Sequence, residues 1–158
     1  MKVKHKGILI FLVVVGLLLV TTTSVFAQTV TFTQHFHNAT QSFPTTNPCS
    51  GAAGTVTLTY NGVMHVTMDS STGTGHFTAT STGDFMFVPV DLTQPTYTGH
   101  FTMWDGANGN FTNFEASDTF NLHGTGSDGS VLAFHMDDHI TVINTSEVVV
   151  SFDHMHCG

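Results

Sequence analysis

The sequence predicts an all-β protein, specifically an eight-stranded antiparallel up-and-down barrel, on the basis of three observations. Residues 28–158 are rich in threonine, valine and phenylalanine, the residue types that favour strands. Apolar and polar residues alternate through most of this region, whereas no stretch shows the periodicity of an amphipathic helix. Short segments of glycine, asparagine, aspartate and serine separate the alternating stretches and indicate turns between strands.

Eight strands are expected in chain order, at residues 30–37, 55–60, 63–69, 76–88, 97–104, 111–123, 131–142 and 147–154. The second and third flank Asn61-Gly62, which is the strongest short hairpin signal, because both residues tolerate positive φ. Residues 38–54 are expected to form a long loop. Since open strand edges promote aggregation, closure into a barrel is the economical arrangement. A two-sheet β-sandwich is the alternative.

The N-terminus has the pattern of a secretory signal peptide. Lys2, Lys4 and Lys6 precede an apolar run at residues 8–20, and the segment ends in Val25-Phe26-Ala27. The alternative is an uncleaved anchor, but the run of about 13 residues is shorter than the ~20 that span a bilayer. We therefore expect residues 1–27 to be removed, residues 28–158 to form a single domain, and the mature protein to be secreted.

The distribution of charge excludes several partners. All 3 of the lysines and arginines lie in residues 1–27, whereas the 11 carboxylates all follow them. Nucleic-acid binding requires lysine or arginine against phosphate, and adhesion to anionic lipid has the same requirement. We expect neither a nucleic-acid partner nor stable membrane association after signal cleavage. The histidines, with reference pKa values near 6.5, are the only side chains that can turn cationic in the mature chain.

The two cysteines, Cys49 and Cys157, are predicted to form a disulfide. An even number of cysteines in an exported chain favours a bridge, because the compartment is oxidising. The alternative is that Cys157 is a thiolate metal ligand within His154-Met155-His156-Cys157.

The function that requires least of this sequence is binding of a small apolar molecule in the barrel. Alternation places Gln34, Tyr60, Phe101 and Phe120 among apolar residues, so these four are the expected ligand contacts. No cofactor is required for this function. Whether the protein is also an enzyme stays open at this point, with a non-catalytic role favoured.

An enzyme of the cyclase or isomerase type is the second hypothesis. Asp118 and His154 fall on apolar strand faces, and His65 lies opposite a leucine if the Asn61-Gly62 hairpin forms. A carboxylate beside an imidazole in an apolar interior is suited to acid–base catalysis. The alternative is that these groups satisfy one another at a barrel end, or that a bulge changes the register.

A divalent transition metal site is the third hypothesis. His35 and His37 form one alternating pair, and His135, Asp137 and His139 share one face of a predicted strand. Imidazole and carboxylate ligands suit zinc, copper or nickel. Because the chain is rich in histidine, such clustering also arises by chance.

Three segments carry a resemblance to known proteins: NPCSGAAGTVTLTYNGV, DTFNLHGTGSDGS and the terminal VSFDHMHCG. They resemble a group of uncharacterised secreted bacterial β-barrel proteins, and the strand plan is similar to calycin-like and allene-oxide-cyclase-like barrels. The resemblance implies a small barrel and carries no activity with it.

Overall fold

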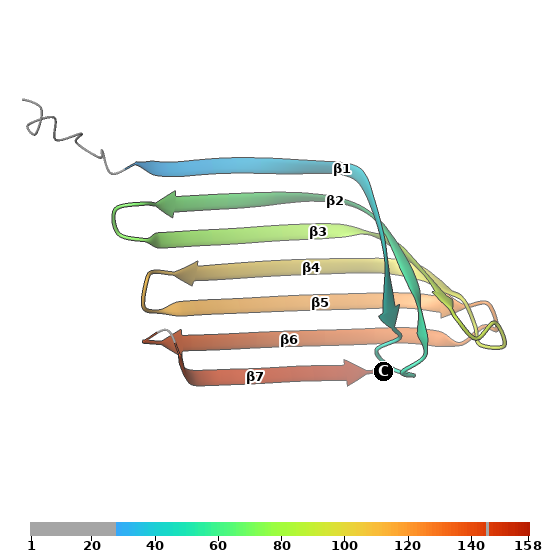
Figure 1. Ribbon diagram of the computed structural model, residues 1–158. Helices are drawn as coiled ribbons and strands as arrows, with labels where there is room; N and C mark the ends of the chain where they lie inside the picture. Colours follow the sequence, from blue (N-terminus) through green and yellow to red (C-terminus); the bar gives the residue numbers. More distant parts are fainter. Residues whose placement is uncertain (1–27, 145) are drawn as a thin grey trace, which may run out of the picture.

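The computed structural model describes residues 28–144 and 146–158, which form seven strands in one antiparallel sheet (Figure 1). The strands are β1 (Thr29–Thr46), β2 (Ala53–Asp69), β3 (Thr74–Pro89), β4 (Tyr97–Gly109), β5 (Phe114–Gly126), β6 (Val131–Ile143) and β7 (Glu147–Cys157). Their order in the sheet is their order in the chain. The all-β class is therefore confirmed, while the predicted signal peptide lies outside the described residues. Within those residues, no helix is long and apolar enough to cross a membrane.

The predicted hairpin at Asn61-Gly62 is wrong, because β2 runs straight through both residues. Its partner β3 is nearly as long and pairs with β2 along its whole length, with Asn61 opposite Thr82 and Gly62 opposite Ser81. A turn at this point would leave half of β3 without backbone partners on its β2 side, which is costly for N–H and C=O groups. The Asn61 side chain instead bonds to the neighbouring strand β1, where its Oδ1 accepts the backbone N–H of Asn38 at 3.1 Å.

The predicted loop at residues 38–54 is also largely strand. β1 continues to Thr46 after a bulge between Phe36 and Ala39, at which Asn38 adopts a positive φ of 48°. A bulge of this kind bends a strand and increases its twist. In Figure 1 the second half of β1 and the first half of β2 turn sharply and cross toward the end of β7.

The sheet does not close into a barrel, and the number of strands gives the physical reason. The predicted strands at residues 55–60 and 63–69 form the single strand β2, so the described chain has seven strands rather than eight. As a result, β1 and β7 run in the same direction. An all-antiparallel barrel needs an even number of strands, because its first and last strands must run in opposite directions. The predicted closed barrel is thus wrong, and the single sheet does not match the two-sheet sandwich either.

The two faces of the sheet differ in chemistry. One, called here the apolar face, carries all of the buried hydrophobic residues: Val56, Phe85, Phe87, Phe101, Leu122, Leu132 and Phe134. The other, called here the threonine–histidine face, carries mostly polar residues. The buried residues lie toward the bent end of the sheet. Toward the opposite end the apolar face is open, and Phe32, Met68 and Phe114 are 45–61% exposed there.

Two glycines permit the tight packing at the bent end. Gly83 lies opposite Phe101, and Gly99 lies opposite Phe85. A Cβ atom at either glycine would lie 2.1 Å from a backbone oxygen of the neighbouring strand, Thr59 O for Gly83 and His123 O for Gly99. Only a residue without a side chain fits these positions.

Candidate functional site

The bent half of the sheet encloses an apolar hollow of ≈ 270 Å³. Most of its wall is formed by apolar side chains from β1 to β6, namely Phe43, Val56, Leu58, Phe85, Phe87, Met103, Phe120, Leu122, Leu132 and Phe134. Thr45, Thr46, Asn47 and Pro48, at the end of β1 and in the loop that follows, complete it. The apolar side chains point to one side because alternate residues of these strands face the same way. A hollow of this composition favours apolar ligands.

A chain of aromatic rings crosses the apolar face beside the hollow. Ring centroids are 6.4 Å apart for Tyr60 and Phe101, 6.0 Å for Phe101 and Phe120, and 6.2 Å for Phe120 and Phe134. The structure therefore brings together three of the four predicted ligand contacts, and of these Phe120 lines the hollow. Gln34 lies on the apolar face before the β1 bulge, where its Nε2 donates to the His35 carbonyl at 3.0 Å.

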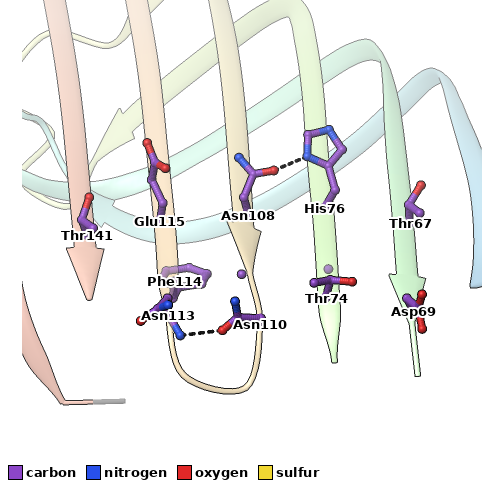
Figure 2. Close-up of a pocket in the computed structure, with 12 residues that line it drawn as sticks. Thr67, Asp69, Thr74, His76, Asn108, Asn110, Asn113, Phe114, Glu115 and Thr141 are labelled. Carbon is purple, nitrogen blue, oxygen red and sulfur yellow. Dashed lines mark hydrogen bonds between the residues drawn. The ribbon is translucent and has the colours of Figure 1, made fainter. Parts of the chain in front are cut away.

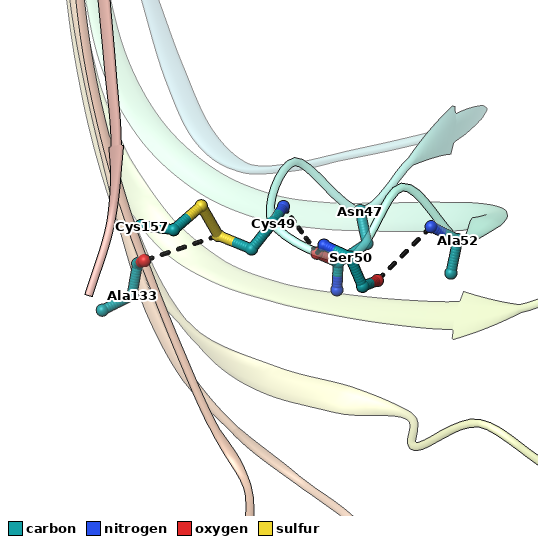
Figure 3. The surroundings of a disulfide bond; sticks show 6 residues. All are labelled: Asn47, Cys49, Ser50, Ala52, Ala133 and Cys157. Atoms are coloured by element: carbon teal, nitrogen blue, oxygen red, sulfur yellow. Dashed lines mark hydrogen bonds between the residues drawn. A yellow bond between two sulfur atoms is a disulfide. The ribbon is translucent and has the colours of Figure 1, made fainter.

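The loop between β1 and β2 covers one side of the hollow and is held by the predicted disulfide, which is confirmed (Figure 3). Cys49 and Cys157 have Cα atoms 5.8 Å apart and join this loop to the end of β7. Asn47, only 3% exposed, organises the loop. Its Oδ1 accepts the backbone N–H groups of Cys49 and Ser50 at 2.9 and 3.0 Å. The loop is thus a fixed wall built from the chain's own polar contacts.

The predicted Asp118–His154 pair does not form, because the two residues lie on opposite faces of the sheet. Asp118 is opposite Asp138 on the apolar face, whereas His154 is opposite Asp137 on the threonine–histidine face. The cause is a bulge in β7: Val148 pairs with Val142, but Val150 pairs with Thr141. One extra residue reverses the facing of every later residue in the strand.

His65 is likewise on the threonine–histidine face and does not join an interior cluster. It lies between Thr33 of β1 and Thr78 of β3, and its Nδ1 is 2.8 Å from Thr33 Oγ1. Its predicted position opposite a leucine depended on the hairpin at Asn61-Gly62, which is absent. The predicted acid–base group of Asp118, His154 and His65 is therefore split between the two faces.

Alignment of the strands instead creates a row of carboxylates, called here the aspartate row. Asp105 lies opposite Asp118, Asp118 opposite Asp138, and Asp138 opposite Asp153, one on each of β4 to β7. Burial, and then the charge of Asp118, raise the pKa of Asp105. Burial, and then the charge of Asp138, raise the pKa of Asp118. Of the four residues, alternation in the sequence singles out only Asp118, because the alignment of the others depends on the register between strands.

The predicted metal ligands of β6 are occupied by hydrogen bonds on the threonine–histidine face. His135 Nδ1 lies 2.7 Å from Asn121 Oδ1, and His135 Nε2 lies 2.8 Å from Asp137 Oδ2. Hydrogen bonds from Thr119 and then His135 lower the pKa of Asp137. His139 is similarly placed, with Nδ1 2.6 Å from Ser117 Oγ and Nε2 3.1 Å from Thr141 Oγ1.

His35 and His37 lie apart from these residues, on β1, with four strands between the two groups. Their rings stack with centroids 6.4 Å apart. Among residues 28–144 and 146–158, no group of three or more histidine, cysteine, aspartate or glutamate side chains is placed to hold a metal ion. The five predicted metal ligands are therefore not brought together.

A second hollow of ≈ 490 Å³, lined mostly by threonine, asparagine and other polar residues, lies at the turn end of the strands (Figure 2). In the figure His76 and Asn108 point toward one another from β3 and β4 and are hydrogen-bonded. The adjoining turn is fixed by Asn110, whose Oδ1 accepts the backbone N–H of Asn113 at 2.9 Å. This hollow is more open than the apolar hollow at the opposite end and, unlike it, has several charged and amide side chains in its lining.

Comparison with known proteins yields no relative: no protein-family model, no curated protein and no solved structure matches the chain.

Proposed function

We propose that this protein binds a small apolar molecule in the hollow at the bent end of its sheet. The observation that carries the proposal is the composition of the wall, in which apolar side chains of six strands surround ≈ 270 Å³. Since benzene fills an apolar cavity of about 150 Å³, this hollow has room for on the order of ten non-hydrogen atoms. The disulfide-held loop supports the proposal because a preformed wall reduces the cost of ordering on binding.

The ligand proposal predicts stabilisation by p-xylene, an apolar probe of suitable size. Because a ligand that binds only the folded state stabilises by mass action, we expect a gain of about 1.4 kcal/mol when free p-xylene is tenfold above its dissociation constant. Urea denaturation with and without p-xylene measures this gain. Leu58→Trp, which fills the hollow, is expected to abolish it.

Val148→Trp is the matched control, since Val148 is 54% exposed on β7 and does not line the hollow. It should keep the full p-xylene effect. An equal effect in Leu58→Trp, or no effect in the wild-type protein, would contradict binding in the hollow.

We also propose that the protein works outside the cytoplasm. The Cys49–Cys157 bridge supports this location, because disulfides persist in oxidising compartments. The expected mature N-terminus is Gln28, and intact-mass measurement of the protein recovered from the culture medium checks it. Ala27→Phe should block processing, because a bulky residue replaces the small one before the cleavage site. A protein recovered only from the cytoplasm would contradict this location, and a secreted protein that retains residues 1–27 would contradict the expected cleavage.

A further inference from the structure

The aspartate row is the least expected arrangement in the sheet. Directly opposed residues of neighbouring antiparallel strands have Cβ atoms about 4.5–5.5 Å apart, and like charges at such positions are destabilising. Here Asp105, Asp118, Asp138 and Asp153 occupy one such line across β4 to β7. Asp118 and Asp138 each have a carboxylate on both sides.

No cation faces the row in the described part of the chain. On β3 the row continues with Ala79, and on β2 and β1 with Met64 and Gln34. The neighbouring rows on the same face contain no titratable group: Met103, Phe120, Met136 and Met155 on one side, and Ala107, Ala116, Ile140 and Ser151 on the other. Residues 28–158 contain no lysine or arginine.

The described histidines do not neutralise the row, because they lie on the opposite face. His154 and His139, for example, are opposite Asp137 and Phe152 rather than any member of the row. The row therefore has two ways to reduce its repulsion, which are screening by salt and uptake of protons. A protonated carboxyl group can donate a hydrogen bond to the ionised neighbour opposite, so that each proton converts a repulsive contact into an attractive one.

We propose that the aspartate row is a proton switch built into the sheet, which loosens strands β4 to β7 when ionised and joins them when protonated. The row lies directly beside Met103 and Phe120, which line the apolar hollow, so the switch acts on one wall of that hollow. The switch concerns the stability of the sheet and does not depend on whether a ligand binds.

The direction of the pH dependence follows from the raised pKa values of Asp105 and Asp118. At these two carboxyl groups the folded state binds protons more tightly than the unfolded state. Their protonation therefore stabilises the fold fully below the unfolded pKa of 3.8, and this stabilisation is lost as pH rises through the folded pKa values. Asp69, Asp91, Asp128 and Asp137 have lowered pKa values. The ionised forms of these four groups stabilise the fold above the unfolded pKa of 3.8, and that stabilisation is lost only as pH falls below it. The aspartate row loses its stabilisation above pH 3.8, so the two effects occur in different pH ranges.

Urea denaturation of the full mature protein between pH 7.5 and pH 4 tests the switch with Asp118→Asn. The amide has the shape of the carboxyl group without its charge, so two repulsive contacts disappear. At pH 7.5 we expect the folding equilibrium constant of the variant to exceed that of the wild type by roughly threefold to tenfold. The excess should shrink toward pH 4, and amide hydrogen exchange in β4 to β7 should be slower in the variant at pH 7.5.

Asp84→Asn is the matched control, because Asp84 lies on the threonine–histidine face of β3 and pairs with His100 at 2.5 Å. It should give no gain at pH 7.5. Asp138→Asn, which also removes two contacts, tests the same expectation if Asp118→Asn does not fold. A variant no more stable than wild type at pH 7.5, or an excess that is the same at pH 7.5 and pH 4, overturns the proposal. Either result leaves ligand binding, which p-xylene tests separately, unaffected.

Discussion

Replacing Phe101 with alanine is expected to destabilise the protein by about 3–5 kcal/mol, the usual cost of removing a large aromatic side chain from a packed core. Phe101 is 2% exposed and belongs to the buried cluster at the bent end of the sheet. Its ring contacts those of Tyr60 and Phe120, and it lies opposite Gly83 on the neighbouring strand. The directly opposed residue on β3 is a glycine, so no side chain at that position fills the space that the Phe101 ring leaves.

Urea denaturation at neutral pH measures this loss, and Phe114→Ala is the control. Phe114 also lies on the apolar face, but at the open end, where it is 45% exposed. Because half of its surface is already in water, its loss should cost at most about 1.5 kcal/mol. Equal losses for the two variants would show that the bent end is not the core of the protein.

Composition and alternation were sufficient to predict the class of the fold and the facing of its first strand. Val30 and Phe32 lie opposite Met68 and Val66 on the apolar face, as the alternation of β1 predicts. The disulfide was also predictable, because two cysteines allow only one pairing within the chain. These features depend on residue type and local spacing, which a single sequence contains.

The prediction of a closed barrel was wrong because it rested on one local turn signal. Pairing between residues far apart in the chain outweighs that signal. Asn61-Gly62 has the residues of a tight turn, but the long strand β3 pairs with β2 on both sides of it. Backbone pairing along the whole of β3 outweighs the preference of two residues for a turn. That single change makes the number of strands odd and leaves the sheet open.

The candidate site shows the same division between local and long-range information. Alternation alone placed Tyr60, Phe101 and Phe120 among apolar residues, but their contacts with one another depend on the register of the strands. His154 was misplaced because the β7 bulge after Val148 leaves no mark on the sequence pattern. The aspartate row was invisible for a related reason: its members are separated by 13, 20 and 15 residues in the chain and meet only through the register.

Removing the disulfide is expected to have an effect as large as that of Phe101→Ala. Cys49 and Cys157 are separated by 108 positions, so their bridge closes almost the whole described chain into a loop. In the chain-entropy model a loop of this length stabilises the folded state by about 4–5 kcal/mol, since it restricts the unfolded chain. We expect the double variant Cys49→Ser/Cys157→Ser to lose stability of this order in urea denaturation.

The disulfide also holds part of the wall of the apolar hollow, which is a role separate from its effect on the unfolded chain. The bridged loop contributes Asn47 and Pro48 to the wall of the apolar hollow, and no strand pairing joins β1 to β7 at this point. Without the bridge, the loop should detach before the sheet unfolds, and p-xylene should lose its stabilising effect even where the double variant is folded. Dithiothreitol should reproduce both results in the wild-type protein and leave the double variant unchanged. If p-xylene still stabilises the folded double variant fully, the bridge acts on the unfolded chain alone and not on the wall of the hollow.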